Sequence, residues 1–190
     1  MSAAGLILAA GLSSRFGADK LAADFRGRPV LQHVLDAAAD AGLQPVVIVL
    51  AGARTSLDWR GARPVINPGP RRGLSSSLAV GLDALAEEAA GKRVLVLLGD
   101  QPLIAVEVIG RLVALPVEPA RPVVVPRYAD GRPGNPVLLE PAAWPIARML
   151  TGDAGMSQLF EARPNLVRYL DVVGANPDID TPADLAALEP

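Results

Sequence analysis

The chain has 190 residues, of which 51% are hydrophobic, and its 18 basic and 20 acidic side chains leave a formal net charge of −2. This size and hydrophobic content predict one globular domain over residues 1–190. With no cysteine and a single histidine, His33, the chain lacks the residues for disulfide frameworks, cysteine nucleophiles and zinc sites. The near-neutral charge offers no basic surface to a nucleic-acid backbone, so we expect a small-molecule partner.

The amino-terminal sequence MSAAGLILAAGLSSRFGADK predicts neither a membrane span nor a secretory signal. Its apolar run covers only about eight residues, which is too short to cross a bilayer. No basic segment precedes that run, as it would in a signal peptide. We therefore expect no membrane partner and a cytoplasmic location.

Short, continuous apolar runs alternate with helical patterns along the first two thirds of the chain. The runs lie at residues 5–9, 45–50, 64–66, 93–98 and 122–125, and the helical patterns at 29–41, 74–90 and 106–115. Continuous β-branched runs are typical of strands covered on both faces. Their alternation with helices predicts a three-layer α/β fold with a mostly parallel sheet and right-handed crossovers. His33 lies between apolar helix positions, and we interpret it as structural.

The alternation breaks at residues 128–139, whose sequence YADGRPGNPVLL contains three successive turn signals. These signals predict a small antiparallel excursion or a long binding loop. Beyond it we expect helices over residues 141–150 and 155–162 and a strand within 166–173. A final helix should open at Thr181, with Asp184 completing a pair of capping contacts.

The loop after the first strand carries the strongest indication of function. A strand that runs into a loop of small residues presents backbone amides at the carboxyl end of a parallel sheet, where α/β folds bind ligands. Arg15 and Lys20 in this loop add positive charge for a polyphosphate. The two common phosphate patterns, G-x-G-x-x-G and G-x-x-x-x-G-K-[ST], are both missing. The alternative is a solvated loop with exposed basic side chains.

The string LAAGLSSRFGADK resembles the nucleotidylyltransferase signature, and four more segments follow it in order: NPGPRRGLSSSLAVGL, LLGDQPLI, GRPGNPVLL and DIDTPADL. Together they are similar to the molybdenum cofactor nucleotidylyltransferase family, the MobA-like NTP transferases, and within it to the cytidylyltransferase branch. The resemblance implies a Rossmann-like nucleotidyltransferase fold. It also implies a reaction in which a phosphorylated acceptor attacks the α-phosphate of a nucleoside triphosphate, with Arg15 and Lys20 stabilising the pyrophosphate that leaves.

Two carboxylates are candidate metal ligands. Asp100 directly follows the strand at 93–98 and should emerge at the same sheet edge as the first loop. From the residues alone, Asp100 is equally well placed to cap a helix that Pro102 would begin. The resemblance assigns Asp100 to Mg²⁺ and makes Asp180 the second ligand, with Asp178 a weaker candidate. Magnesium is usually held by one or two carboxylates together with substrate phosphates.

Two further segments are candidates for nucleobase and acceptor contacts. From the residues alone, one serine of the run at 75–77 should be a helix N-cap. The resemblance assigns the nucleobase to side chains of this region and to backbone groups of the first loop, namely Asn67, Ser75, Ser76, Ser77, Leu8, Ala9, Ala10 and Gly11. It assigns the acceptor to Arg132 and Asn135. Related cytidylyltransferases have histidine where Asn135 lies, and this departure leaves the acceptor open.

The resulting hypothesis is a Mg²⁺-dependent nucleotidyltransferase that joins CMP from CTP to a phosphorylated small molecule, with molybdopterin the first candidate. The resemblance favours CTP over GTP because the loop reads LAAG rather than LAGG, and ATP stays open. Alternatives are a sugar or polyol phosphate acceptor, and a non-catalytic carrier of a nucleotide or cofactor. The resemblance further implies transient contact with a molybdoenzyme or its chaperone.

Overall fold

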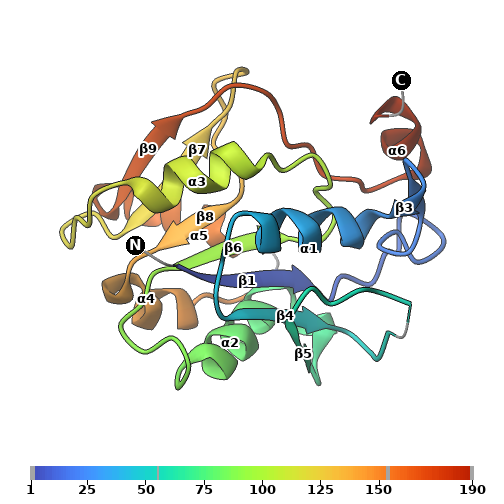
Figure 1. Ribbon diagram of the computed structural model, residues 1–190. Helices are drawn as coiled ribbons and strands as arrows, with labels where there is room; N and C mark the ends of the chain where they lie inside the picture. Colours follow the sequence, from blue (N-terminus) through green and yellow to red (C-terminus); the bar gives the residue numbers. More distant parts are fainter. Residues whose placement is uncertain (1–2, 55, 153–154, 189–190) are drawn as a thin grey trace.

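The computed structural model describes residues 3–54, 56–152 and 155–188 and shows a central sheet between two layers of helices (Figure 1). Within these residues, seven strands pair in the order β5-β4-β1-β6-β8-β7-β9. The strands are β1 (Ala4–Ala9), β4 (Val46–Leu50), β5 (Arg63–Ile66), β6 (Val94–Leu98), β7 (Val123–Arg127), β8 (Val137–Leu139) and β9 (Val167–Asp171). Only β8 runs antiparallel to its neighbours in this sheet, which confirms the mostly parallel sheet with a small antiparallel excursion.

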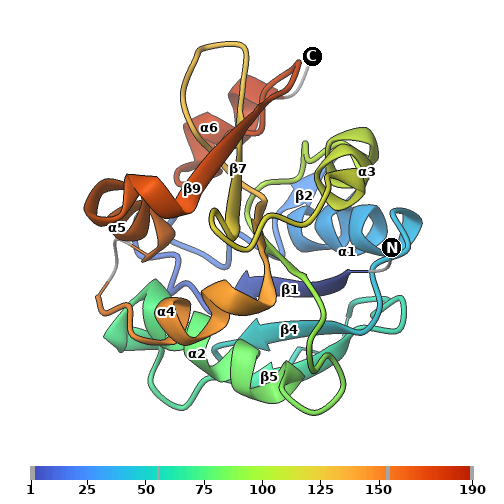
Figure 2. The same cartoon turned by 90° about the vertical axis from the view of Figure 1, so that its left-hand side faces the viewer.

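The helices cover the two faces of the sheet. Figure 2 shows α1 (Val30–Asp40) and α3 (Val106–Ala114) on one face, and α2 (Leu74–Leu85) and α4 (Trp144–Arg148) on the other. The second face is also covered by α5 (Gly155–Ala162), and α6 (Pro182–Leu188) ends the described chain. Short 3-10 turns lie at η1 (Pro70–Arg72), η2 (Pro141–Ala143) and η3 (Pro164–Leu166), and β2 (Asp24–Phe25) pairs with β3 (Arg28–Pro29). None of the helices in these residues is long and apolar enough to cross a membrane.

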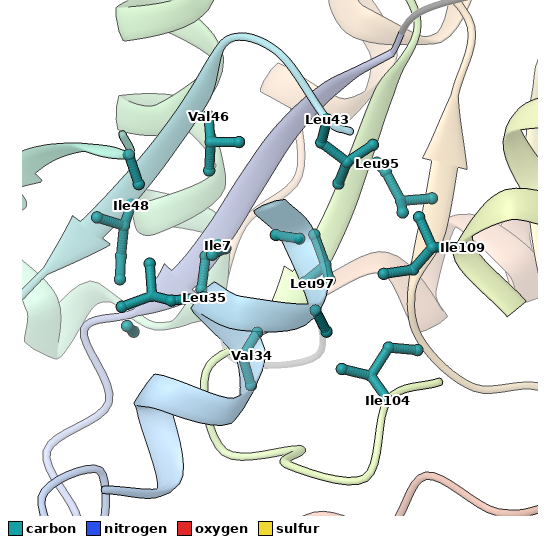
Figure 3. Packing of buried hydrophobic residues seen from close by; sticks show 14 of the residues in the cluster. Ile7, Val34, Leu35, Leu43, Val46, Ile48, Leu95, Leu97, Ile104 and Ile109 are labelled. Atoms are coloured by element: carbon teal, nitrogen blue, oxygen red, sulfur yellow. The ribbon is translucent and has the colours of Figure 1, made fainter. Parts of the chain in front are cut away.

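Two hydrophobic clusters hold the layers together because successive strand side chains face opposite sides. In β1, Ile7 packs with Leu35 of α1 and Leu97 of β6 in the first cluster (Figure 3). The neighbouring Leu6 belongs to the second cluster, under α2. There α2 approaches β1 so closely that a Cβ atom on Gly81 would lie 2.2 Å from Leu6 Cδ1. Every residue of β1 is buried, as its continuous apolar sequence predicts.

The structure corrects several predicted helix boundaries. The helix after Asp100 begins at Val106 with Ala105 as N-cap, so Pro102 does not start it and Asp100 does not cap it. The N-cap of α2 is Gly73, at φ 90°, rather than one of the serines. A positive φ of this kind suits glycine, which has no Cβ to clash with the backbone.

Two predicted helices are shorter than expected. The pattern at 74–90 ends as an α-helix at Leu85, and residues 141–150 divide into η2 and α4. The predicted cap of the last helix is confirmed, because Thr181 N donates to Asp184 Oδ2 at 2.7 Å and Asp184 N donates to Thr181 Oγ1 at 3.2 Å. His33 lies within α1 with Nε2 2.8 Å from the carbonyl oxygen of Phe25, in agreement with a structural role.

Candidate active site

A pocket of about 580 Å³ lies at the carboxyl ends of β1 and β6. Four chain segments form it: the loop after β1, the turn that leads into α2, the end of β6 with the residues up to Asp100, and the segment between β9 and α6. All four segments lie at the carboxyl ends of strands of the parallel set, which share one edge of the sheet. The pocket therefore lies where the topology of an α/β sheet places a ligand.

The pocket holds an ion cluster made of four predicted site residues. Lys20 Nζ donates to Asp100 Oδ2 at 2.6 Å and to Asp180 Oδ1 at 3.1 Å. Arg15 Nη1 lies 3.0 Å from Asp180 Oδ2. The Lys20 side chain is 10% exposed, whereas that of Arg15 is 71% exposed. Side chains 80 positions or more apart in the sequence thus meet in one ion cluster.

The charges of this cluster reinforce one another. Partial burial lowers the pKa of Lys20, but the hydrogen bonds and charges of Asp100 and Asp180 outweigh that effect and raise it. Lys20 is therefore a cation at neutral pH, held between two carboxylates. Asp178 also lines the pocket, and its pKa is raised by partial burial and by the charge of Asp100, with a hydrogen bond from Gln101 acting in the opposite direction.

The loop after β1 owes its shape to local turns and to one ion pair. Ser13 and Gly17 adopt positive φ angles of 51° and 76°. The Asp19 carboxylate accepts hydrogen bonds from both terminal nitrogens of the Arg54 guanidinium, with Nη2 at 2.9 Å from Oδ1. This pair connects the loop to the segment after β4. Asp19 directly precedes Lys20 in the sequence. Its contact with Arg54 therefore fixes the backbone next to the residue whose ammonium group lies in the pocket. Sequence reasoning did not single out Asp19 or Arg54.

The predicted nucleobase segment divides into a residue that faces the pocket and residues that support it. Asn67 is 2% exposed, and its Nδ2 donates to Ser76 Oγ at 2.9 Å and to Ser77 Oγ at 3.0 Å. Its Oδ1 accepts the Gly69 N–H at 2.8 Å, so the Asn67 amide is engaged on both sides. Of these side chains, Ser77 lines the pocket.

Among the other predicted nucleotide contacts, Leu8, Ala10 and Gly11 line the pocket. The Ala9 side chain packs in the cluster on the α1 face of the sheet, and Ser75 is buried. The turn into α2 adds Arg71, an exposed cation that also lines the pocket. In the sequence, the Arg71-Arg72 pair alone gives no indication of which arginine faces a ligand.

The predicted acceptor residues lie in the loop between β7 and β8, outside the described pocket lining. Arg132 is exposed, and its N–H donates to Asp130 Oδ1 at 2.9 Å. The Asn135 carbonyl accepts hydrogen bonds from Tyr128 Oη at 2.6 Å and from Asn176 Nδ2 at 3.2 Å. The loop begins at the carboxyl end of β7, so it arises from the same sheet edge as the pocket.

The donor set at the pocket fits a divalent cation that is shared with phosphate. Asp100 and Asp180 already surround one positive charge, the Lys20 ammonium. Among the described residues, no three His, Cys, Asp or Glu side chains are arranged as a complete metal site. Magnesium binds in this manner, taking one or two carboxylates from the protein and further oxygens from substrate phosphates.

The family model of the MobA-like NTP transferase domain matches residues 5–168 of the chain. The chain belongs to the MobA-like NTP transferase family. Its activity is accordingly nucleotidyl transfer. Purine catabolism protein PucB of Bacillus subtilis (strain 168) is 29% identical over 194 residues, which cover 95% of this chain and 92% of PucB. A probable molybdenum cofactor guanylyltransferase of Pyrococcus furiosus is 30% identical over 67% of this chain and 62% of its own length.

Solved structures agree with this assignment. Rv0371c from Mycobacterium tuberculosis H37Rv is 32% identical, with a TM-score of 0.82 over 99% of this chain and 98% of that one. A complex of Rv0371C with manganese is 29% identical, with a TM-score of 0.76 over the same shares of the two chains. The Rossmann-like nucleotidyltransferase fold predicted from the sequence is thus confirmed. The metal in the second of these structures is manganese, a divalent cation, whereas the sequence prediction was Mg²⁺.

Proposed function

We propose that the enzyme transfers CMP from CTP to a phosphorylated small molecule in a Mg²⁺-dependent reaction. The observation that carries this proposal is the cluster of Lys20, Asp100 and Asp180 in a pocket at the carboxyl edge of the sheet. A site with two carboxylates, two cations and backbone amides can position a triphosphate and neutralise its charge. Transfer of this type depends on positioning and charge stabilisation more than on a covalent nucleophile.

The roles of the charged residues follow from their positions. Arg15 and Lys20 bind the triphosphate and stabilise the negative charge that develops on the departing pyrophosphate. Asp100 and Asp180 would hold Mg²⁺, which neutralises charge on phosphate oxygens when bound. An oxygen of the acceptor's phosphate forms a bond to the α-phosphorus, and the bond from that phosphorus to the bridging oxygen of the β-phosphate breaks. A phosphate monoester is largely ionised near neutral pH, so no general base is required.

The nucleobase is proposed to lie against the loop after β1 and Ser77. The Ser77 oxygen accepts a hydrogen bond from Asn67. The Ser77 hydroxyl proton is thereby available to an acceptor atom of the base. Asn67 and Ser76 act behind this contact and hold the turn that Ser77 follows.

GTP is the second candidate nucleotide, because relatives with 29–35% identity are named molybdenum cofactor guanylyltransferases. CTP is favoured here by the LAAG sequence of the first loop. The names of the same relatives support molybdopterin as the phosphorylated acceptor, with Arg132 and Asn135 in the loop that would face it. A molybdoenzyme or its chaperone would then receive the product.

The test follows pyrophosphate release with each of CTP, GTP, ATP and UTP in the presence of Mg²⁺ and molybdopterin. Release with CTP that is abolished in Asp100→Ala supports the proposal. The matched control is Asp40→Asn, which removes an exposed carboxylate paired with Arg60 at the end of α1. Release with GTP alone would assign the guanylyl reaction. Nucleotide binding without release for molybdopterin, sugar phosphates or polyol phosphates would indicate a carrier.

A further inference from the structure

The segment that carries Asp178 and Asp180 has no regular secondary structure to fix it. It follows β9 and reaches the start of α6 at Pro182 without entering a helix or strand. Carboxylates on such a segment need specific contacts to face a ligand reproducibly. One backbone contact is Ile179 N, which donates to the Asp100 carbonyl oxygen at 3.0 Å. The fully buried Ile179 side chain packs with Phe25 and Val30 and anchors the segment from the other side.

Lys20 and Arg15 hold Asp180, and Gln101 supplies side-chain contacts to Asn176 and Asp178. Gln101 directly follows Asp100 and is 4% exposed. Its Nε2 donates to Asp178 Oδ1 at 2.8 Å and to the Asn176 carbonyl oxygen at 3.1 Å. Its Oε1 accepts from Asn176 Nδ2 at 3.1 Å. Both ends of this buried amide are therefore engaged with the segment that carries the carboxylates.

The Gln101 contact orients Asp178 in a specific way. The bond to Nε2 engages Oδ1 and so fixes the rotation of the carboxylate, while Asp178 itself lines the pocket beside Asp100 and Asp180. A carboxylate held by one oxygen can offer the other to a cation. Groups that orient metal ligands in this manner change metal affinity by about 10- to 100-fold when they are removed.

The same amide network continues away from the pocket. Asn176 Nδ2 also donates to the Asn135 carbonyl, which accepts the Tyr128 hydroxyl. Tyr128 and Gln101 thus lie at opposite ends of one network, and only Gln101 contacts a pocket carboxylate. A substitution at Tyr128 is therefore a matched control, because it removes a hydrogen bond from the same network without removing a contact to a pocket carboxylate.

We propose that Gln101 is a positioning residue that orients Asp178 to contribute to the binding of the metal–nucleotide complex. This inference rests on the proposed function, because it requires a metal-bound nucleoside triphosphate in the pocket. It assigns Asp178 an active part beside Asp100 and Asp180, and it explains why a buried glutamine follows the metal aspartate.

The experiment measures the affinity of Mn²⁺ with CTP, and separately with GTP, by electron paramagnetic resonance titration without any acceptor. The variants are Gln101→Met, which keeps the length but removes the hydrogen bonds, Asp178→Asn, the double variant, and Tyr128→Phe. Gln101→Met and Asp178→Asn should each weaken binding by about 10- to 100-fold. The double variant should lose no more affinity than the single variant that binds less tightly, because both substitutions remove the same contribution to binding. Tyr128→Phe should bind as the wild type does.

The outcomes separate the inference from the proposed function. If wild-type protein binds no Mn²⁺–nucleotide complex, the proposed function fails and the inference fails with it. If wild-type protein binds and Asp178→Asn binds equally well, the inference alone is overturned. Losses that add in the double variant also overturn it, because Gln101 would then act independently of Asp178. If Gln101→Met does not fold, the Asp178→Asn result decides.

Discussion

Lys20 occupies the position between Asp100 and Asp180 that a metal ion would share, so its removal should affect metal and nucleotide in opposite directions. Lys20→Met keeps the length of the side chain and removes its charge. In the wild type, Mn²⁺ without nucleotide must displace an ammonium that is 10% exposed and lies 2.6 Å and 3.1 Å from the two carboxylates. The substitution leaves both carboxylates without this competing cation.

The magnitude follows from the two contacts. A hydrogen bond between charged groups contributes about 1.5–3 kcal/mol. Displacement of the ammonium by a metal ion requires the loss of at least one such bond, so Lys20→Met should bind Mn²⁺ alone about 10- to 100-fold more tightly, at about 1.4 kcal/mol per factor of ten. Binding of CTP should weaken, because the triphosphate loses a cation.

The assay is calorimetric titration of Mn²⁺ without nucleotide, followed by thermal unfolding with and without the metal. Lys20→Met should unfold at a lower temperature than the wild type without metal, since two neighbouring carboxylates lose their counter-charge, and Mn²⁺ should restore much of the difference. Lys92→Met, at the chain's other lysine, is the control, since Lys92 precedes β6 at the opposite edge of the sheet. An Mn²⁺ affinity in Lys20→Met equal to or below that of the wild type would refute the reasoning.

Three further predictions concern the surroundings of the pocket. Arg71→Ala should raise KM for the nucleotide about tenfold in steady-state kinetics, which corresponds to the loss of one charge-assisted hydrogen bond. Arg72→Ala should change KM less than twofold, because only Arg71 of this pair lines the pocket. Equal effects of the two substitutions would contradict this assignment. Gly81→Ala should destabilise the protein by about 1–3 kcal/mol in urea unfolding, because the new Cβ would overlap a β1 side chain, and an unchanged midpoint would show that α2 can shift. Partial burial raises the pKa of Asp19, but the hydrogen bond and charge of Arg54 outweigh this effect and lower the pKa below 3.8. The ion pair therefore stabilises the protein above that pH. This stabilisation is lost as the pH falls through the lowered pKa of the folded state. The difference in Tm between wild type and Arg54→Met should therefore shrink as pH falls from about 6 to 3, and a difference independent of pH would contradict the pairing.

The sequence predicts the strands well because their signal is local. The runs at 45–50 and 93–98 are apolar at every position, as strands buried on both faces require, and β4 and β6 lie within them. The same topology brings Asp100 and the first loop to one edge of the sheet. The direct pairing of Lys20 with both aspartates is not predictable in this way, because it depends on how side chains meet in the folded protein.

Predictions fail where tertiary contacts decide. The serines at 75–77 have a high preference for helix N-caps, yet Gly73 takes this position and the Ser76 and Ser77 hydroxyls bond to Asn67 instead. The turn signals at 128–139 correctly predict an antiparallel excursion. They contain no information on its distance from the pocket, because Tyr128 and Asn176 determine the position of Asn135 through contacts that span up to 41 residues.

The antiparallel strand β8 has a consequence for how substrates of different size can be accommodated. It joins the strands around the nucleotide pocket to those that frame the loop at 128–136, through paired residues such as Val96 with Val137 and Val124 with Leu138. The spacing of neighbouring strands is fixed at about 4.8 Å by their backbone hydrogen bonds. The two sides of the site therefore cannot separate as hinged domains do. With the acceptor at this loop, as proposed, accommodation of a larger or smaller acceptor would depend on the length and composition of the loop, while the nucleotide side would stay unchanged.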